Sequence, residues 1–165
     1  MDRVSTHWGR IDFLLHLIGG FLGGVQIHAT SLQQWQQMME LNLKTAFLFC
    51  RAVLPIMIKQ NYGRIITVGS KGGLQGTAGI AAYAAAKAGL INFTQSLAAE
   101  GKSHNIHANV IIPSIIDTPE NRQAMPRADF KDWVTPDSLA KVILFLCSDD
   151  ANDINGATIP VFGKS

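Results

Sequence analysis

The sequence predicts an α/β fold: a parallel sheet of about four strands with flanking helices. One observation is that short apolar runs alternate along the chain with longer runs whose apolar residues recur at helical spacing. Another is that the short runs lack polar alternation, which is typical of strands buried on both faces of a parallel sheet. A chain of 165 residues has room for one sizeable core. We therefore expect a single domain over residues 1–165, with right-handed crossovers between its strands.

The composition narrows the classes of function. Charged residues make up 16% of the chain, and the formal net charge is +2, so neither value favours nucleic-acid binding. Cys50 and Cys147 lie in apolar helical patterns without metal-ligand spacing, which predicts reduced thiols, no metal site and a cytoplasmic location. The apolar run 13–18 is too short to span a bilayer, and we expect no membrane association.

The first predicted strand covers residues 11–18 and ends at a pair of glycines. His16 lies in this strand, where we expect a hydrogen-bonded histidine; a ligand or a base is the alternative. The glycine-containing loop that follows leads to Ser31, which begins a helix through a capping box with Gln34.

The helix after Ser31 carries one apolar stripe that includes a polar residue. Asn42 falls on this stripe, so we expect its amide to be buried and hydrogen-bonded. Pro55 is expected to kink or end the helix, with a separate last turn near residues 58–61. The residues of the predicted stripe are Trp35, Met39, Asn42, Ala46, Phe49 and Val53.

Three more strands and two more helices follow in alternation. Strands are predicted over 64–68, 106–112 and 157–162, since each is a short apolar run next to turn residues. An alanine-rich helix is predicted over 81–100, and a later helix begins at Thr135 with proline at its first position.

Ser70, Tyr83 and Lys87 form the constellation that carries chemistry. Tyr83 and Lys87 are four residues apart, so they share one face of the alanine-rich helix. A nearby ammonium favours the phenolate, so we expect Lys87 to lower the pKa of Tyr83 toward working pH. Ser70 follows the strand 64–68 and can hydrogen-bond the same substrate oxygen, and the group could exchange a proton with an alcohol or carbonyl.

These residues resemble the active site of the short-chain dehydrogenase/reductase family, whose Asn, Ser, Tyr and Lys tetrad maps onto Asn42, Ser70, Tyr83 and Lys87. The resemblance implies a partial Rossmann-like fold and an NAD(P)-dependent oxidoreductase. Hydride would move between nicotinamide and a small carbonyl or alcohol substrate, and Tyr83 would exchange the proton. It also implies NAD or NADP as cofactor, with contacts from Gly19, Lys87, Pro113 and Thr118.

The segment 117–130 resembles the corresponding piece of dihydropteridine reductases, which lies over the substrate. The resemblance makes four residues candidate substrate contacts: Arg122, Met125, Phe130 and Trp133. The alternative is a packed surface helix with Met125 and Phe130 turned toward the core. At the end of the first strand, His16-Leu17-Ile18-Gly19 stands where the family has Asn-Asn-Ala-Gly.

The sequence contains no Thr-Gly-x-x-x-Gly-x-Gly turn, on which a dinucleotide pyrophosphate rests in the family. We therefore expect the chain to correspond to the C-terminal part of the family's domain. The alternative function is a truncated, catalytically inactive member that folds as an oligomer and binds no dinucleotide. The resemblance implies self-association through helices 32–59 and 81–100, and the strand edge 11–18 is a further candidate because unpaired edges recruit strands.

Overall fold

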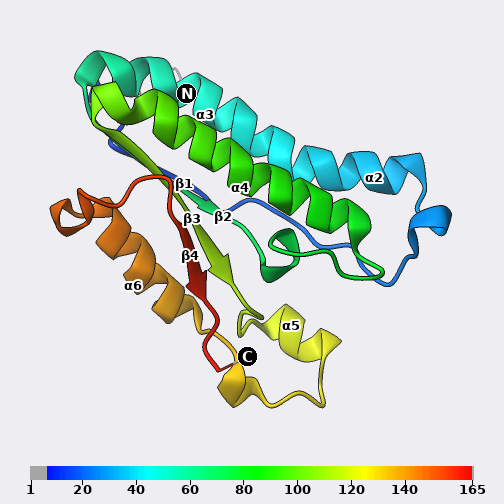
Figure 1. Cartoon of the computed structure of the whole chain (residues 1–165). Helices are drawn as coiled ribbons and strands as arrows, with labels where there is room; N and C mark the ends of the chain where they lie inside the picture. Colours follow the sequence, from blue (N-terminus) through cyan, green and yellow to red (C-terminus); the bar gives the residue numbers. More distant parts are fainter. Residues whose placement is uncertain (1–6, 165) are drawn as a thin grey trace.

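The computed structural model describes residues 7–164 and shows a four-stranded sheet with helices on its two faces (Figure 1). The polar residues 1–10 are predicted to be irregular, and most of them lie outside the described residues. The strands and α-helices are β1 (Phe13–His16), α2 (Leu32–Met39), α3 (Thr45–Gln60), β2 (Gly63–Val68), α4 (Ala81–Gly101), β3 (Ile106–Pro113), α5 (Pro119–Ala124), α6 (Pro136–Cys147) and β4 (Thr158–Val161).

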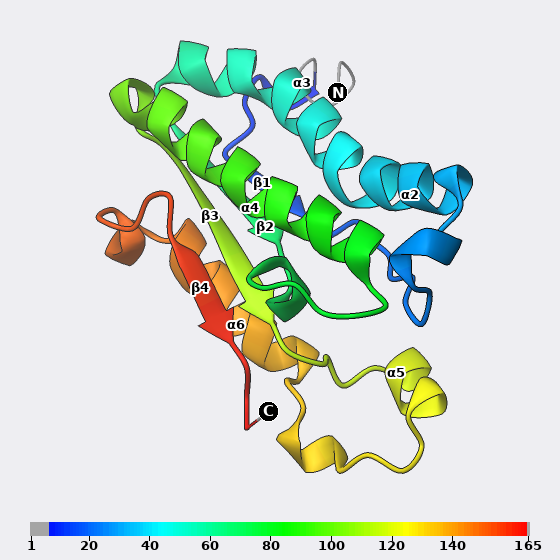
Figure 2. The same cartoon turned by 45° about the vertical axis from the view of Figure 1, so that its right-hand side comes forward.

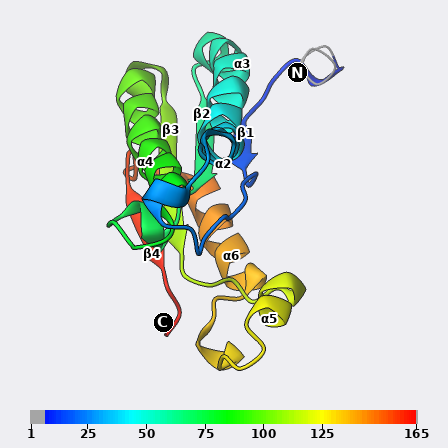
Figure 3. The same ribbon diagram turned by 90° about the vertical axis from the view of Figure 1, so that its right-hand side faces the viewer.

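The sheet has the order β1-β2-β3-β4, and every neighbouring pair is parallel. Leu14 is in register with Ile65, and Val110 with Thr158. Helices α3 and α4 lie on one face of the sheet and α6 on the other, as the turned views show (Figures 2 and 3). The predicted α/β, Rossmann-like class with about four strands is therefore confirmed.

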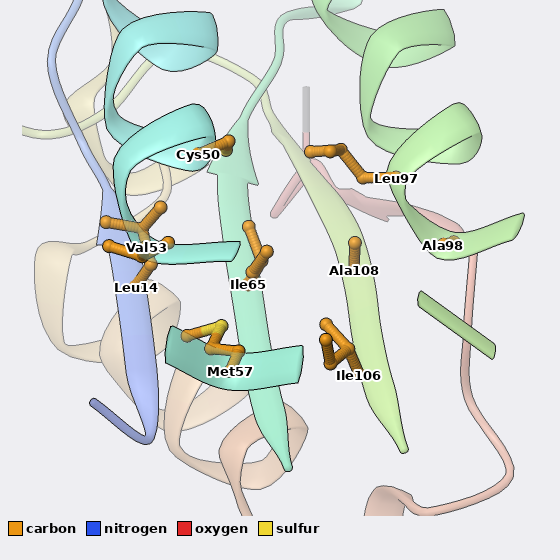
Figure 4. Packing of buried hydrophobic residues seen from close by; sticks show 9 residues of the cluster. All are labelled: Leu14, Cys50, Val53, Met57, Ile65, Leu97, Ala98, Ile106 and Ala108. Carbon is orange, nitrogen blue, oxygen red and sulfur yellow. The ribbon is translucent and has the colours of Figure 1, made fainter. Parts of the chain in front are cut away.

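The larger helical layer is joined to the sheet by a cluster of buried apolar side chains (Figure 4). β1, β2 and β3 supply one side of the cluster, and α3 and α4 supply the other. The buried members are Leu14, Cys50, Val53, Met57, Ile65, Leu97, Ala98, Ile106 and Ala108. Burial of this face fixes α4 above the sheet, and α4 carries Tyr83 and Lys87.

A second cluster joins α6 to the opposite face of β2 and β3. It includes Ile66 and Ile111 from the strands and Leu139, Ile143 and Leu146 from α6. The helix begins as predicted, because the Thr135 hydroxyl accepts a hydrogen bond from the Ser138 amide at 3.1 Å and Pro136 occupies its first turn.

The predicted apolar stripe of the first long helix is partly wrong. The buried line runs through Met38, Asn42, Ala46, Cys50, Val53 and Met57, whereas Trp35 and Phe49 are exposed. The reason is a π-helical segment, η2 (Glu40–Lys44), which joins α2 to α3. A π turn holds one residue more than an α turn, so it shifts the inward-facing positions on either side.

Pro55 does not end the helix, so the expectation of an end there with a separate last turn is wrong. A kink at Pro55 stays a prediction. α3 continues from Thr45 to Gln60, with Pro55 exposed inside it, and ends at Asn61 in the left-handed conformation. An αL residue is a common helix stop, so residues 58–60 form the last turn of the same helix.

The stretch Leu32–Gln60 is long and apolar enough to cross a membrane by length and composition alone, with a mean hydropathy of 1.5. Core helices of globular proteins meet the same criterion. Here the line from Met38 to Met57 is buried, and its later members pack against β1 and β2.

β1 is shorter than the predicted strand 11–18 because Leu17 and Ile18 lie beyond its pairing with β2. It is an edge of the sheet among the described residues, and Phe13 and Leu15 are 49% and 43% exposed. Its inward residues, Leu14 and His16, are buried. This exposed edge is the feature expected at strand 11–18.

Candidate active site

The candidate site lies at the carboxyl end of the sheet, where ligands bind in open parallel α/β folds. Gly19 follows β1, Ser70 follows β2, and Thr118 follows β3. The first turns of α4 add Tyr83 and Lys87 from above the sheet. The fold therefore places residues from separate stretches of the chain at this end of the sheet.

Lys87 is the most deeply buried charged group of the site, with 5% of its surface exposed. Its Nζ donates a hydrogen bond to the Val68 carbonyl at 2.8 Å and lies 5.9 Å from the centre of the Tyr83 ring. Burial lowers the pKa of Lys87 to about 8. The ammonium is therefore charged at neutral pH and becomes neutral in mildly alkaline solution.

The predicted effect of Lys87 on Tyr83 is wrong for the protein without ligands. The pKa of Tyr83 is raised above 10, chiefly because burial disfavours the phenolate, and a hydrogen bond with Ser70 opposes this rise. At neutral pH Tyr83 is therefore a protonated phenol, which is the form that can donate a proton.

Ser70 is placed by the turn that follows β2. Its hydroxyl oxygen accepts a hydrogen bond from the Gly72 amide at 3.2 Å and caps a short 3-10 helix, η3 (Lys71–Gly73). The same side chain forms the hydrogen bond that opposes the pKa rise of Tyr83. Ser70 therefore lies beside Tyr83. That both groups bind one substrate oxygen stays a prediction.

Asn42 is fully buried, as expected, and its amide is hydrogen-bonded. Its Oδ1 accepts from the Gly20 amide at 3.1 Å, and its Nδ2 donates to the carbonyls of Gly20 and Met38 at 3.0 and 3.1 Å. Asn42 therefore fixes the chain just beyond β1. The family resemblance also implies that Asn42 holds a water that links Lys87 to solvent, and this role stays a prediction.

Gly19 borders both Asn42 and Lys87. A Cβ atom at this position would lie 2.9 Å from Asn42 Oδ1 and 3.2 Å from Lys87 Nζ. A side chain would therefore crowd the Lys87 ammonium, and glycine leaves the approach to that group open.

His16 is buried at the end of β1, with its Nε2 3.1 Å from the Thr45 hydroxyl oxygen. The Thr45 hydroxyl donates to the Leu41 carbonyl, so His16 Nε2 is the donor to Thr45. Burial is the main cause that lowers the pKa of His16, and the ring is neutral at neutral pH. The expected hydrogen-bonded histidine is confirmed.

The predicted substrate residues interact mainly with one another. Arg122 Nη2 lies 2.8 Å from Asp117 Oδ2, and its guanidinium lies 4.8 Å from the centre of the Phe130 ring. The Phe130 and Trp133 rings are 4.9 Å apart, and Trp133 is 7% exposed. Met125, just after α5, is half-buried. These contacts stay within the segment and do not join it to Ser70, Tyr83 or Lys87.

The other two predicted cofactor residues lie at and beyond the end of β3. Pro113 is buried as the last residue of that strand, and the Thr118 hydroxyl accepts from the Asn121 amide at 3.3 Å, which caps α5. Within residues 7–164, no three His, Cys, Asp or Glu side chains gather as a metal site would require.

Comparison with known proteins identifies the family. The model of a family described as enoyl-(acyl carrier protein) reductase matches residues 1–163. The 3-oxoacyl-[acyl-carrier-protein] reductase FabG of Escherichia coli is 36% identical over 171 residues, which cover 99% of this chain and 70% of FabG. The chain belongs to the short-chain dehydrogenase/reductase family.

Other relatives agree with this membership. The acetoacetyl-CoA reductase of Shinella zoogloeoides is 34% identical, over 98% of this chain and 70% of that protein. The structure of an oxidoreductase of the short-chain dehydrogenase/reductase family from Burkholderia thailandensis superposes with a TM-score of 0.86 at 35% identity. That superposition covers 98% of this chain and 66% of the Burkholderia chain.

Two expectations are not supported by these matches. They run over 98–99% of this chain, which gives no support to its assignment as only the C-terminal part of the domain. They also give no support to the alternative of a catalytically inactive member. This short-chain dehydrogenase/reductase spans about 70% of the length of the curated relatives.

Sequence reasoning missed two features of the site. The Val68 carbonyl holds Lys87, and no side-chain pattern could have indicated a main-chain acceptor. Phe21 contacts the Tyr83 ring, with the ring centres 5.0 Å apart. The one available signal was a single large aromatic residue among the glycines 19, 20, 23 and 24.

Proposed function

We propose that the protein is an NAD(P)-dependent oxidoreductase that reduces a carbonyl compound, with Tyr83 as the proton donor. The observation that carries this proposal is that Tyr83 lies beside Ser70 and that its ring centre lies 5.9 Å from the buried Lys87 ammonium. A neutral phenol suits the reductive direction because a carbonyl oxygen gains a proton as it becomes an alcohol. The reverse reaction uses the same groups with the proton moving back.

The three side chains have separate roles in this mechanism. The Ser70 hydroxyl donates a hydrogen bond to the substrate oxygen and polarises the carbonyl. Tyr83 transfers its proton to that oxygen, and the Lys87 ammonium stabilises the phenolate that forms. Asn42 acts at a distance from the reacting atoms, because it holds the chain at Gly20 through two hydrogen bonds and bonds the Met38 carbonyl through a third.

The residues present fit the nicotinamide end of the cofactor. Gly19 leaves the approach to Lys87 open, since a Cβ there would lie 3.2 Å from Nζ. Lys87, Gly19, Pro113 and Thr118 would hold this end of the dinucleotide. The chemistry that a bound nicotinamide supplies is hydride exchange at the carbonyl carbon.

The relatives suggest the substrate class to be tested. FabG is named as a 3-oxoacyl-[acyl-carrier-protein] reductase and the Shinella protein as an acetoacetyl-CoA reductase. Both names describe reduction of a ketone in a 3-oxoacyl thioester. We propose a small ketone of this kind as the substrate.

The experiment combines cofactor binding and turnover by the whole chain. Thermal unfolding is followed with NADH, NADPH and neither, because a ligand that binds the native state raises the melting temperature. Oxidation of whichever reduced cofactor binds is then measured with acetoacetyl-CoA as the ketone. The proposal expects a higher melting temperature with at least one cofactor and ketone-dependent oxidation. A flat response to both cofactors at millimolar concentration contradicts it.

Self-association through helices 32–59 and 81–100 forms a second part of the proposal. The outer surface of α3 is apolar, with Phe47 and Leu48 45% and 48% exposed. A groove of about 540 Å³ between α4 and the stretch from Met39 to Phe47 is lined by Leu43, Phe47 and Phe93 among others. Exposed apolar patches of this kind support an interaction between proteins. The edge strand 11–18, with exposed Phe13 and Leu15, is a second candidate contact.

Light scattering tests this self-association. The whole chain is expected to form a dimer or a larger oligomer, and Phe47→Glu is expected to weaken it. Leu144→Glu on α6 is the matched control, since Leu144 is 68% exposed on the opposite helical layer. A monodisperse wild-type monomer contradicts both candidate contacts.

A further inference from the structure

Phe21 lies on a segment that is tied down on both sides of it. The Gly20 amide and carbonyl bond Asn42, and the Val25 amide donates to the Gly79 carbonyl at 3.2 Å. Gly79 lies just before α4, on which Tyr83 is the third residue. The two attachments therefore hold the short span 21–24 next to the catalytic tyrosine.

Within this span the Phe21 ring packs edge-on against Tyr83. Their ring centres are 5.0 Å apart, and the planes are inclined by 80°. Phe21 is nevertheless 68% exposed. The ring is thus fixed by a contact on one side and presents most of its apolar surface to solvent.

Glycine makes room for this arrangement. A Cβ on Gly23 would lie 2.5 Å from Phe21 Cζ and 3.1 Å from Ile80 Cγ2. A Cβ on Gly72 would in turn lie 3.0 Å from Ile80 Cδ1 and 3.7 Å from Tyr83 Cε1. Phe21, Ile80 and Tyr83 therefore lie around the same two glycines, and we name these three side chains the Phe21 wall.

The Phe21 wall borders the reacting groups. Ser70 Oγ lies 3.8 Å from the same Gly72 Cβ position, so the hydroxyl that would polarise the carbonyl is next to the wall. A substrate with its oxygen at Ser70 and Tyr83 has substituents that extend from the carbonyl carbon. An apolar substituent that covers Phe21 would remove exposed aromatic surface from water, which is favourable.

We propose that Phe21 is a specificity-determining residue that contacts the apolar substituent of the carbonyl substrate, so that the site favours ketones with an alkyl or aryl chain over the smallest ketones. The turnover that this inference predicts rests on the proposed function. The binding component of the inference does not depend on turnover.

The kinetic test compares acetone with methyl hexyl ketone. The wild type is expected to show a higher kcat/KM for methyl hexyl ketone than for acetone. For methyl hexyl ketone, the kcat/KM of Phe21→Ala is expected to be about tenfold below that of the wild type, mainly because KM rises. Phe21→Leu is expected to restore part of the loss. Ile27→Ala is the matched control, because Ile27 is 71% exposed on the same segment. An equal fall in kcat for both ketones would mean that Phe21 only supports Tyr83, and would overturn the proposal.

The binding test uses secondary octyl alcohol and isopropanol as probes without cofactor. The octyl alcohol is expected to raise the melting temperature of the wild type and of Ile27→Ala, and to have a smaller effect on Phe21→Ala. Equal shifts in wild type and Phe21→Ala, or no shift in the wild type, overturn the proposal. A wild type that binds the octyl alcohol through Phe21 yet turns over no ketone contradicts the proposed function and leaves the specificity surface standing.

Discussion

The two regions expected to form the site differ in what their side chains bind. Around Lys87 lie Gly19, Val68 and Tyr83 from separate stretches of the chain, and the ammonium is held by a main-chain carbonyl at 2.8 Å. In the segment 117–133 the charged and aromatic groups pair locally: Arg122 with Asp117, and Phe130 with Trp133. The first region holds charged and polar groups ready for a substrate, whereas the second has already paired its own.

This difference distinguishes side chains that serve a binding site from side chains that only stabilise the fold. Burial disfavours the charged form of Lys87 and lowers its pKa to about 8. Keeping an ammonium buried costs folding free energy, so its presence points to a function other than stability. The Arg122–Asp117 pair carries less of this cost, because Arg122 is exposed and pairs with the partly buried Asp117. Substitutions in the two regions should therefore act on different quantities.

The largest expected effect is on catalysis, from Tyr83→Phe. Removal of the phenol hydroxyl removes the proton donor, so we expect kcat to fall by at least about 100-fold. The ring remains, and the free energy of unfolding should change little. Steady-state turnover and denaturant unfolding measure the two quantities, and a variant that keeps wild-type turnover would show that Tyr83 is not the donor.

Trp133→Ala should have the largest effect on stability. Trp133 is 7% exposed and packs against Phe130, so its truncation should lower the free energy of unfolding by about 3–5 kcal/mol. Urea unfolding checks this value, with Trp8→Ala as a control because Trp8 is 71% exposed. A loss of turnover at full stability would instead place Trp133 in contact with the substrate.

Lys87→Met should reduce turnover and yet stabilise the fold at pH 7. The folded-state pKa of Lys87 is about 8, below the ordinary value of 10.5, so between these values the unfolded chain holds more protons. This group therefore makes the wild type gain stability as pH rises from 8 to 10.5. We expect the variant to be more stable by about 2 kcal/mol at pH 7, and the advantage to vanish above about pH 10.5.

Urea unfolding at neutral and alkaline pH measures this advantage. Lys102→Met, at the far end of α4, controls for the removal of a surface charge. A Lys87→Met variant that is less stable than the wild type at pH 7 would show that the ammonium is a structural group.

Arg122→Ala should have the smallest effect. The Arg122 side chain is 52% exposed, and surface ion pairs contribute about 0–1 kcal/mol to stability. The KM for ketones should stay within about fivefold of the wild-type value. A much larger rise in KM at unchanged stability would place Arg122 on the substrate and remove the contrast between the two regions.

The sequence was sufficient for much of the fold because its signals are local. Apolar runs indicated all four strands, and the Ser31 capping box and the Thr135-Pro136 start are both present. The π-helical segment at Glu40–Lys44 left no such signal, and it changed which residues of the long helix are buried. The helix end predicted at Pro55 is absent because α3 continues through this residue at an exposed position.

The site was predictable where a motif fixes its residues. Ser70, Tyr83 and Lys87 meet as the spacing and the family resemblance imply. The pKa of Tyr83 was not predictable, since it depends on how deeply the phenol is buried as well as on the distance to Lys87. Phe21 was missed because its contact with Tyr83 joins parts of the chain that are far apart in sequence.

The pH dependence of ketone reduction tests the central claim most directly. If Tyr83 donates its proton as a neutral phenol beside a charged Lys87, kcat should be level at neutral pH and fall above about pH 8 as Lys87 loses its charge. A kcat that instead rises through pH 8 would mean that the reactive form is a phenolate, and would contradict the account.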